Sequence, residues 1–139
     1  MKRFVAALAA ALLTTAAASA QSYPGDPGAG TQRGIESVNN SGQVGTVTLF
    51  NAGAGTRVLV ELQGTIPGRM QSVRLYRGPS CDDIGNTGPV YFLIDMKNGV
   101  SRSLVKAPED KLLSGNYNVV VFSSNAAGAR ATACGHLYQ

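Results

Sequence analysis

From residue 43 onwards, apolar and polar residues alternate in short runs, which is the pattern of half-buried β-strands. In the run 57–63, Val58 and Val60 fall on one face, whereas Arg57 and Glu61 fall on the other. Glycine, proline or asparagine interrupts the pattern roughly every ten to fifteen residues, a spacing typical of a β-sandwich or barrel. We expect further strands at 44–50, 70–76, 90–94, 100–105, 117–122 and 132–137.

Two segments depart from this strand pattern. Residues 108–113 (PEDKLL) predict one short helical turn, with Pro108 at its first position and Gly115 as its stop. Residues 21–42 are predicted to be a flexible tail, because the stretch 21–32 (QSYPGDPGAGTQ) has too few apolar residues to offset its ordering entropy. An edge strand could form near 35–38. A single β domain is therefore expected over 43–139.

The first twenty residues have the features of an export signal. Lys2 and Arg3 form a positive start, residues 4–13 are apolar, and residues 18–20 (Ala-Ser-Ala) supply a small-x-small cleavage pattern. An N-terminal membrane anchor is the disfavoured alternative, because the apolar run has about ten residues and a spanning helix needs roughly twenty. We predict residues 1–20 to be a signal peptide, with the periplasm or the medium outside a bacterium as the destination and no integral membrane segment.

Composition narrows the class of protein. The chain has 139 residues, which is enough for one domain of ordinary size. Only 14% of its residues are charged and 17 are glycine, which argues against a helical bundle or coiled coil. The formal charge of +4 includes Lys2 and Arg3, and no basic run is interleaved with aromatic residues. Nucleic acid is therefore not an expected partner.

The two cysteines are candidates for one disulfide. In an oxidising compartment, Cys81 and Cys134 can pair only with each other. The alternative is a pair of free thiols that bind a metal, but the chain has no CxxC spacing and His136 is its only histidine. We therefore predict a Cys81–Cys134 bridge.

Residues with catalytic potential are few. A site that needs several imidazoles is excluded by the single histidine, and no serine lies in a GxSxG turn. The acids Asp82 and Asp83 are adjacent, but they lack the alternating ligand spacing of an EF-hand loop, so a solvated turn is the favoured interpretation. The sequence thus predicts a protein that is not an enzyme and holds no cofactor.

Four segments together share a pattern with one known family. They are 45–49 (GTVTL), 72–81 (SVRLYRGPSC), 112–124 (LLSGNYNVVVFSS) and 133–135 (ACG). They resemble, in the same order, four segments of copper,zinc superoxide dismutase-like domains. The first two are the opening strand and the segment that carries a His-x-His pair and the first bridging cysteine. The last two are a later segment that ends in Val-Val-His and the segment with the second bridging cysteine. The CHRD domain is a second candidate family. The resemblance implies a Greek-key β-sandwich or barrel of immunoglobulin-like type.

The metal ligands of that family are missing at the matching positions. Arg74 and Tyr76 stand where the paired histidines would be, and Phe122 stands in place of the later copper histidine. Arginine has no lone pair to donate and phenylalanine has no ligand atom, so a copper site of the usual kind is not expected. We therefore expect a non-catalytic binding or envelope-accessory protein. The alternative is a copper- or zinc-binding protein, or a dismutase-related oxidoreductase, with a non-standard site built from Tyr76, His136 and acids.

The same three positions form a candidate partner patch. Arg74 and Tyr76 project from one side of their strand, opposite Val73 and Leu75, and the resemblance brings Phe122 close to them. Arginine and tyrosine are enriched where protein interfaces concentrate their binding energy. The partner would be a protein or another envelope component, and the protein itself a monomer or homodimer. In the alternative, Tyr76 and Phe122 only pack together, with Arg74 capping them from solvent.

Overall fold

A computed structural model describes residues 30–85 and 87–138 of the chain. The predicted signal peptide, residues 1–20, and the part of the predicted tail up to residue 29 lie outside the described residues.

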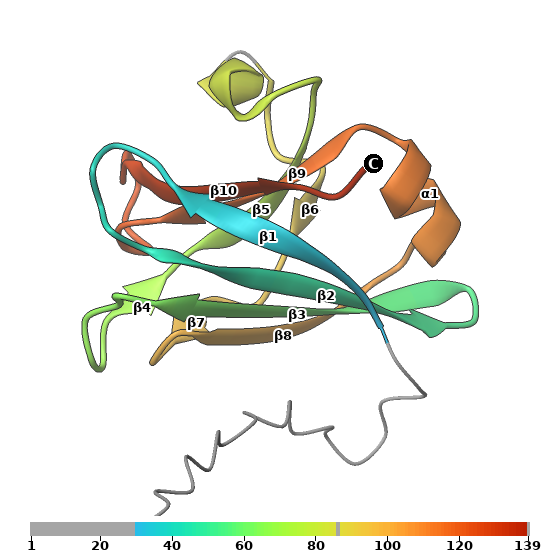
Figure 1. Cartoon of the computed structure of the whole chain (residues 1–139), viewed down its shortest axis with the longest axis horizontal. Helices are drawn as coiled ribbons and strands as arrows, with labels where there is room; N and C mark the ends of the chain where they lie inside the picture. Colours follow the sequence, from blue (N-terminus) through green and yellow to red (C-terminus); the bar gives the residue numbers. More distant parts are fainter. Residues whose placement is uncertain (1–29, 86, 139) are drawn as a thin grey trace, which may run out of the picture.

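The described chain forms a ten-stranded sheet in which every pair of neighbouring strands is antiparallel (Figure 1). Its order is β4-β7-β8-β3-β2-β1-β10-β9-β5-β6. The elements along the chain are β1 (Thr31–Ser37), β2 (Val44–Ala52), β3 (Gly55–Gln63), β4 (Met70–Gln71), β5 (Val73–Arg77), the 3-10 helix η1 (Cys81–Gly85), β6 (Tyr91–Phe92), β7 (Met96–Lys97), β8 (Val100–Val105), α1 (Glu109–Ser114), β9 (Tyr117–Phe122) and β10 (Ala131–His136).

The sheet curls into two layers that are joined through β1. Strands β5, β6, β9 and β10 lie over β2, β3, β7 and β8 in Figure 1. Strand β1 pairs with β2 along Thr31 to Ile35 and with β10 at Glu36 and Ser37. The prediction of an all-β fold with one short helix is confirmed, whereas the Greek-key topology stays a prediction.

The core fills the space between the two layers. Alternate residues of β3 and β5 point into it, so Val58 and Val60 are buried as predicted, and so are Val73 and Leu75. Helix α1 begins one residue after Pro108 and closes one end of the core with the buried side chain of Leu112. Burial of these aliphatic side chains is the main favourable contribution to folding.

The prediction of a flexible tail was wrong for residues 31–37. These residues form β1, which lies in the middle of the sheet order rather than at an edge. Ile35 is the one buried residue of the strand, so its apolar content gives a weak sequence signal. The strand is instead stabilised by main-chain pairing with β2 along most of its length and with β10 at its end, which periodicity cannot reveal. The β domain therefore begins by Thr31 and not at residue 43.

The strand predicted at 70–76 is interrupted at Ser72, where the chain passes from β4 in one layer to β5 in the other. A buried amide group lies at this crossing. Gln71 is 1% exposed, and its Nε2 donates to Oε1 of Gln43 at 3.0 Å and to the carbonyl oxygen of Phe122 at 2.7 Å. These bonds tie β4 to the start of β2 and to the end of β9.

We expect Gln71→Ala to lower the free energy of unfolding by about 2 kcal/mol, because it removes the buried donor that Oε1 of Gln43 and the carbonyl oxygen of Phe122 share. Urea denaturation would measure the loss. The matched control is Gln63→Ala, which shortens an exposed glutamine of β3 and should leave stability within about 0.5 kcal/mol of wild type. Equal stability of the two variants would contradict a structural role for the buried amide.

Candidate functional site

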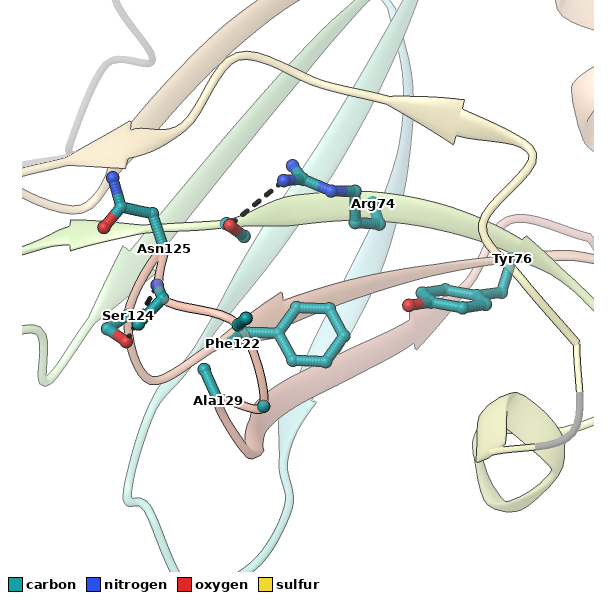
Figure 2. A pocket seen from close by; sticks show the side chains of 10 residues that line it. Arg74, Tyr76, Phe122, Ser124, Asn125 and Ala129 are labelled. Atoms are coloured by element: carbon teal, nitrogen blue, oxygen red, sulfur yellow. Dashed lines mark hydrogen bonds between the residues drawn. The ribbon is translucent and has the colours of Figure 1, made fainter.

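An open pocket of about 330 Å³ lies on the outer face of β5 and β9 (Figure 2). The two strands supply its floor and the loop after β9 supplies its wall. We call it the outer-face pocket. Its lining residues are Ser72, Arg74, Tyr76, Phe122, Ser124, Asn125, Ala126, Ala127, Gly128 and Ala129. All three residues of the predicted patch therefore line one site.

The strand register explains why these side chains meet. Arg74 of β5 lies opposite Val120 of β9, and Tyr76 lies opposite Asn118. Phe122 is two residues beyond Val120 and so emerges on the same face. Main-chain bonding extends the pairing of β5 with β9 to Ser72, just before β5, because the amide of Phe122 donates to the carbonyl oxygen of Ser72 at 2.9 Å. The side chains of the site therefore project from hydrogen-bonded strands and not from loops alone.

Tyr76 and Phe122 form an aromatic pair. Their ring centroids are 6.3 Å apart, with the ring planes tilted by 54°. On the same face, Val120 is fully buried although it is not part of the main core cluster. The outer face therefore has a small apolar layer of its own, and the packing of Tyr76 on Phe122 that we considered as the alternative is present.

Arg74 does not cap this pair as that alternative supposed. Its Nη1 donates to the carbonyl oxygen of Val73 at 2.9 Å and to Oδ1 of Asp95 at 3.4 Å, and its Nη2 donates to Oγ of Ser72 at 3.1 Å. The guanidinium carbon lies 4.8 Å from the centroid of the Phe92 ring, within cation–π range. Arg74 is thus held between Asp95 and Phe92, with its charge compensated.

Sequence reasoning missed Phe92, Asp95 and the loop 124–129. The sequence of the predicted strand 90–94 contained a signal for Phe92, because a two-residue alternation places it on the face opposite Tyr91 and Leu93. Leu93 is buried, whereas Phe92 is 71% exposed and lies opposite Arg74 in the pairing of β6 with β5. The loop carries no comparable pattern, since alanine, glycine and serine are common in turns of every kind.

Burial raises the pKa of the Tyr76 phenol above its ordinary value of 10.0, and the nearby Arg74 cation partly offsets this rise. Burial also raises the pKa of Tyr91. A phenol whose pKa is raised by folding gives stability that is present below pH 10.0 and is lost as the pH rises through the higher pKa of the folded state. In the pocket, Tyr76 is therefore a neutral hydroxyl at any physiological pH.

Tyr76→Phe should reduce the loss of stability above pH 10.0, because the variant has no phenol to ionise at this position. Thermal unfolding followed from pH 8 to 11 would show the effect as a shallower alkaline decline than in wild type. Tyr91 still contributes to the decline in the variant. Superimposable profiles of the two proteins would contradict the raised pKa of Tyr76.

The side chains of the alternative metal site are not brought together. Tyr76, Asn118 and His136 lie in one row across β5, β9 and β10, with Asn118 in the middle. Two strand spacings separate Tyr76 from His136, or about 10 Å. Nδ1 of His136 is hydrogen-bonded to Oδ1 of Asn118. In residues 30–85 and 87–138, no group of three or more His, Cys, Asp or Glu side chains is placed to hold a metal ion.

The predicted disulfide is confirmed. Cys81, the first residue of η1, is bonded to Cys134 in β10. The bridge borders a second groove, of about 510 Å³, which also has Glu36, Asp82 and His136 in its lining. This groove is separate from the outer-face pocket, with which it shares no lining residue.

No protein-family model matches this chain, and none of the curated proteins compared with it is similar enough to count as a relative. Within the part of the chain that the structure describes, none of the helices has the length and apolar character needed to cross a membrane. We base the functional inference on the outer-face pocket, because the three residues of the predicted patch meet there.

Proposed function

We propose that the protein is an exported, non-catalytic binding protein that engages a component of the bacterial envelope, or another extracytoplasmic partner, at the outer-face pocket. The observation that carries this proposal is the convergence of Arg74, Tyr76 and Phe122, from two paired strands, on one open pocket. Side chains mounted on a sheet are held more precisely than side chains mounted on loops, which favours specific binding.

Unused hydrogen-bonding capacity supports the proposal. The hydroxyl of Tyr76 and the side-chain amide of Asn125 have no hydrogen-bond partner within the described residues. Arg74 uses three of the five N–H groups of a guanidinium. Ligand sites typically combine an apolar lining with a few convergent polar groups of this kind.

We also propose that the chain is a degenerate relative of the superoxide dismutase-like domains. The disulfide joins the two cysteines that the resemblance pairs, which supports this affiliation. Arg74, Tyr76 and Phe122 stand in place of the family's histidines and form the pocket instead. On this proposal, the face that holds copper in the family has become a metal-free binding surface, and cleavage after residue 20 delivers the protein to the periplasm or the medium.

Capture from envelope extract tests the binding function. We expect the exported wild-type protein, immobilised on resin, to retain a ligand that Arg74→Ala and Asn125→Ala do not retain. The matched control is Arg69→Ala, which removes an exposed arginine outside the pocket and should retain the same ligand as wild type. Equal recovery by all four proteins, or no recovery by wild type, would contradict the proposal.

Metal analysis tests the alternative of a non-standard metal site. We expect the protein purified from copper- and zinc-supplemented medium to keep no stoichiometric metal after dialysis against a mild chelator, because β9 separates Tyr76 from His136 and Nδ1 of His136 is hydrogen-bonded to Asn118. Superoxide dismutation should not exceed that of free copper. Retained copper together with activity above that level would favour the alternative.

A further inference from the structure

We infer that the outer-face pocket takes a neutral, hydroxyl-bearing ligand of about the size of one saccharide unit, such as an exposed sugar of a glycan. This inference rests on the proposed binding function and names the ligand class for the same site. It is carried by the charge, the hydrogen-bonding groups, the aromatic surface and the volume of the pocket.

The charge of the pocket is already balanced. Among the lining residues within the described part of the chain, Arg74 and Tyr76 are the only ionisable ones. Arg74 is paired with Asp95, and the side chains of the pair are 19% and 26% exposed. Asp95 already neutralises much of the guanidinium charge, so the pocket offers an added carboxylate or phosphate little net attraction, whereas a neutral ligand can accept from the remaining N–H groups and leave the ion pair intact. The pocket therefore favours a ligand without net charge.

The remaining polar groups both donate and accept hydrogen bonds. The Ser72 hydroxyl accepts a bond from Arg74 and keeps its own hydrogen, and the Ser124 hydroxyl accepts from the amide of Ala126 at 3.2 Å. The hydroxyl of Tyr76 and the amide of Asn125 add two further groups of mixed character. Sugar hydroxyls also donate and accept, so they match this set better than a donor-only or acceptor-only ligand does.

The apolar part of the pocket suits the face of a saccharide ring. Figure 2 shows the hydroxyl end of Tyr76 directed towards Phe122, so the polar and aromatic surfaces lie side by side. The face of an aromatic ring is electron-rich and attracts the weakly positive C–H groups of a sugar. Gly128, at a φ of +77°, lets the loop turn with no side chain projecting over the site.

The size of the pocket limits the ligand to about one ring. Its volume of about 330 Å³ is near the lower end of the roughly 300–1,000 Å³ found for small-molecule sites. One side is open, so a ring at the end of a longer chain could enter while the rest of that chain stays in solvent. A glycan with an exposed terminal sugar meets these requirements.

The test uses a panel of immobilised neutral and acidic oligosaccharides, followed by calorimetry of the exported protein with each sugar that is retained. We expect a neutral saccharide to bind with an affinity that changes little between low and high salt, because no ion pair forms with the ligand. Tyr76→Phe should weaken that affinity about tenfold through the loss of one hydrogen bond, with an unchanged melting temperature. The control Gln63→Ala should bind as wild type does.

Each other result would overturn the inference. Retention of acidic sugars alone, with an affinity that falls steeply as salt rises, would show an anion site. A saccharide that binds Tyr76→Phe and wild type equally would show a different site. If no sugar of the panel is retained but capture from envelope extract still depends on Arg74 and Asn125, the saccharide inference fails and the binding function stands. Protease sensitivity of the captured ligand would then identify a protein partner.

Discussion

Replacing both cysteines by alanine is expected to lower the free energy of unfolding by about 4 kcal/mol. The Cys81–Cys134 bridge closes 53 residues of sequence, and a loop of this length loses considerable entropy in the unfolded chain. That loop contains β6, β7, β8 and β9, so the bridge constrains strands of both layers while they are unfolded. Urea denaturation with linear extrapolation would measure the loss.

Two controls separate the bridge from other effects of these substitutions. Cys81→Ala and Cys134→Ala should each cost nearly as much as the double variant, because either one breaks the same bond. Addition of a reductant should destabilise the wild-type protein by a similar amount and leave the double variant unchanged. A double variant as stable as oxidised wild type would show that the bridge contributes nothing to folding.

Gly45→Ala is expected to destabilise the protein by about 3 kcal/mol, because there is no space for the methyl group that alanine adds. Gly45 lies in β2 between Ile35 of β1 and Leu62 of β3. A Cβ atom at this position would come within 1.9 Å of the carbonyl oxygen of Glu61 and 2.9 Å of the Cα of Leu62. These are main-chain atoms of a paired strand, so they cannot move away without loss of sheet hydrogen bonds. Thermal or urea unfolding would measure the effect.

Gly34→Ala is the matched control for this prediction. Gly34 lies in β1 opposite Thr46, next to the pair formed by Ile35 and Gly45. A Cβ atom at Gly34 would have no neighbour within 4 Å. This substitution should raise stability by about 0.5 kcal/mol, since alanine loses less backbone entropy on folding than glycine. Equal effects of the two substitutions would show that the main chain of β3 does not exclude a side chain at position 45.

The strands with a strong apolar alternation could be predicted from the sequence. In β3, Val58, Val60 and Leu62 are all buried, and the helical turn after Pro108 forms as expected. Strand β1 could not be predicted at its full length, because Ile35 alone is buried and main-chain pairing on both sides supplies most of its stabilisation. Such pairing depends on the final topology, which local patterns do not contain.

The candidate site could be predicted only in part. The two-residue period places Arg74 and Tyr76 on one outer face, and the pairing of β5 with β9 adds Phe122, as the resemblance implied. The partners of Arg74 could not be predicted, because Asp95 lies 21 residues further along the chain and approaches through the connection from β6 to β7. Long-range contacts of this kind decide whether an arginine is available to a ligand or already paired.

The most direct test of the binding site is an amide NMR map of the isotope-labelled protein, recorded with the envelope fraction eluted from a wild-type capture column. We expect shift changes concentrated at residues 72–76 and 122–129, the segments that line the outer-face pocket. The same fraction should produce no such changes in Asn125→Ala. Changes concentrated at Glu36, Asp82 and His136, beside the disulfide, would contradict the assignment of the binding site to the outer-face pocket.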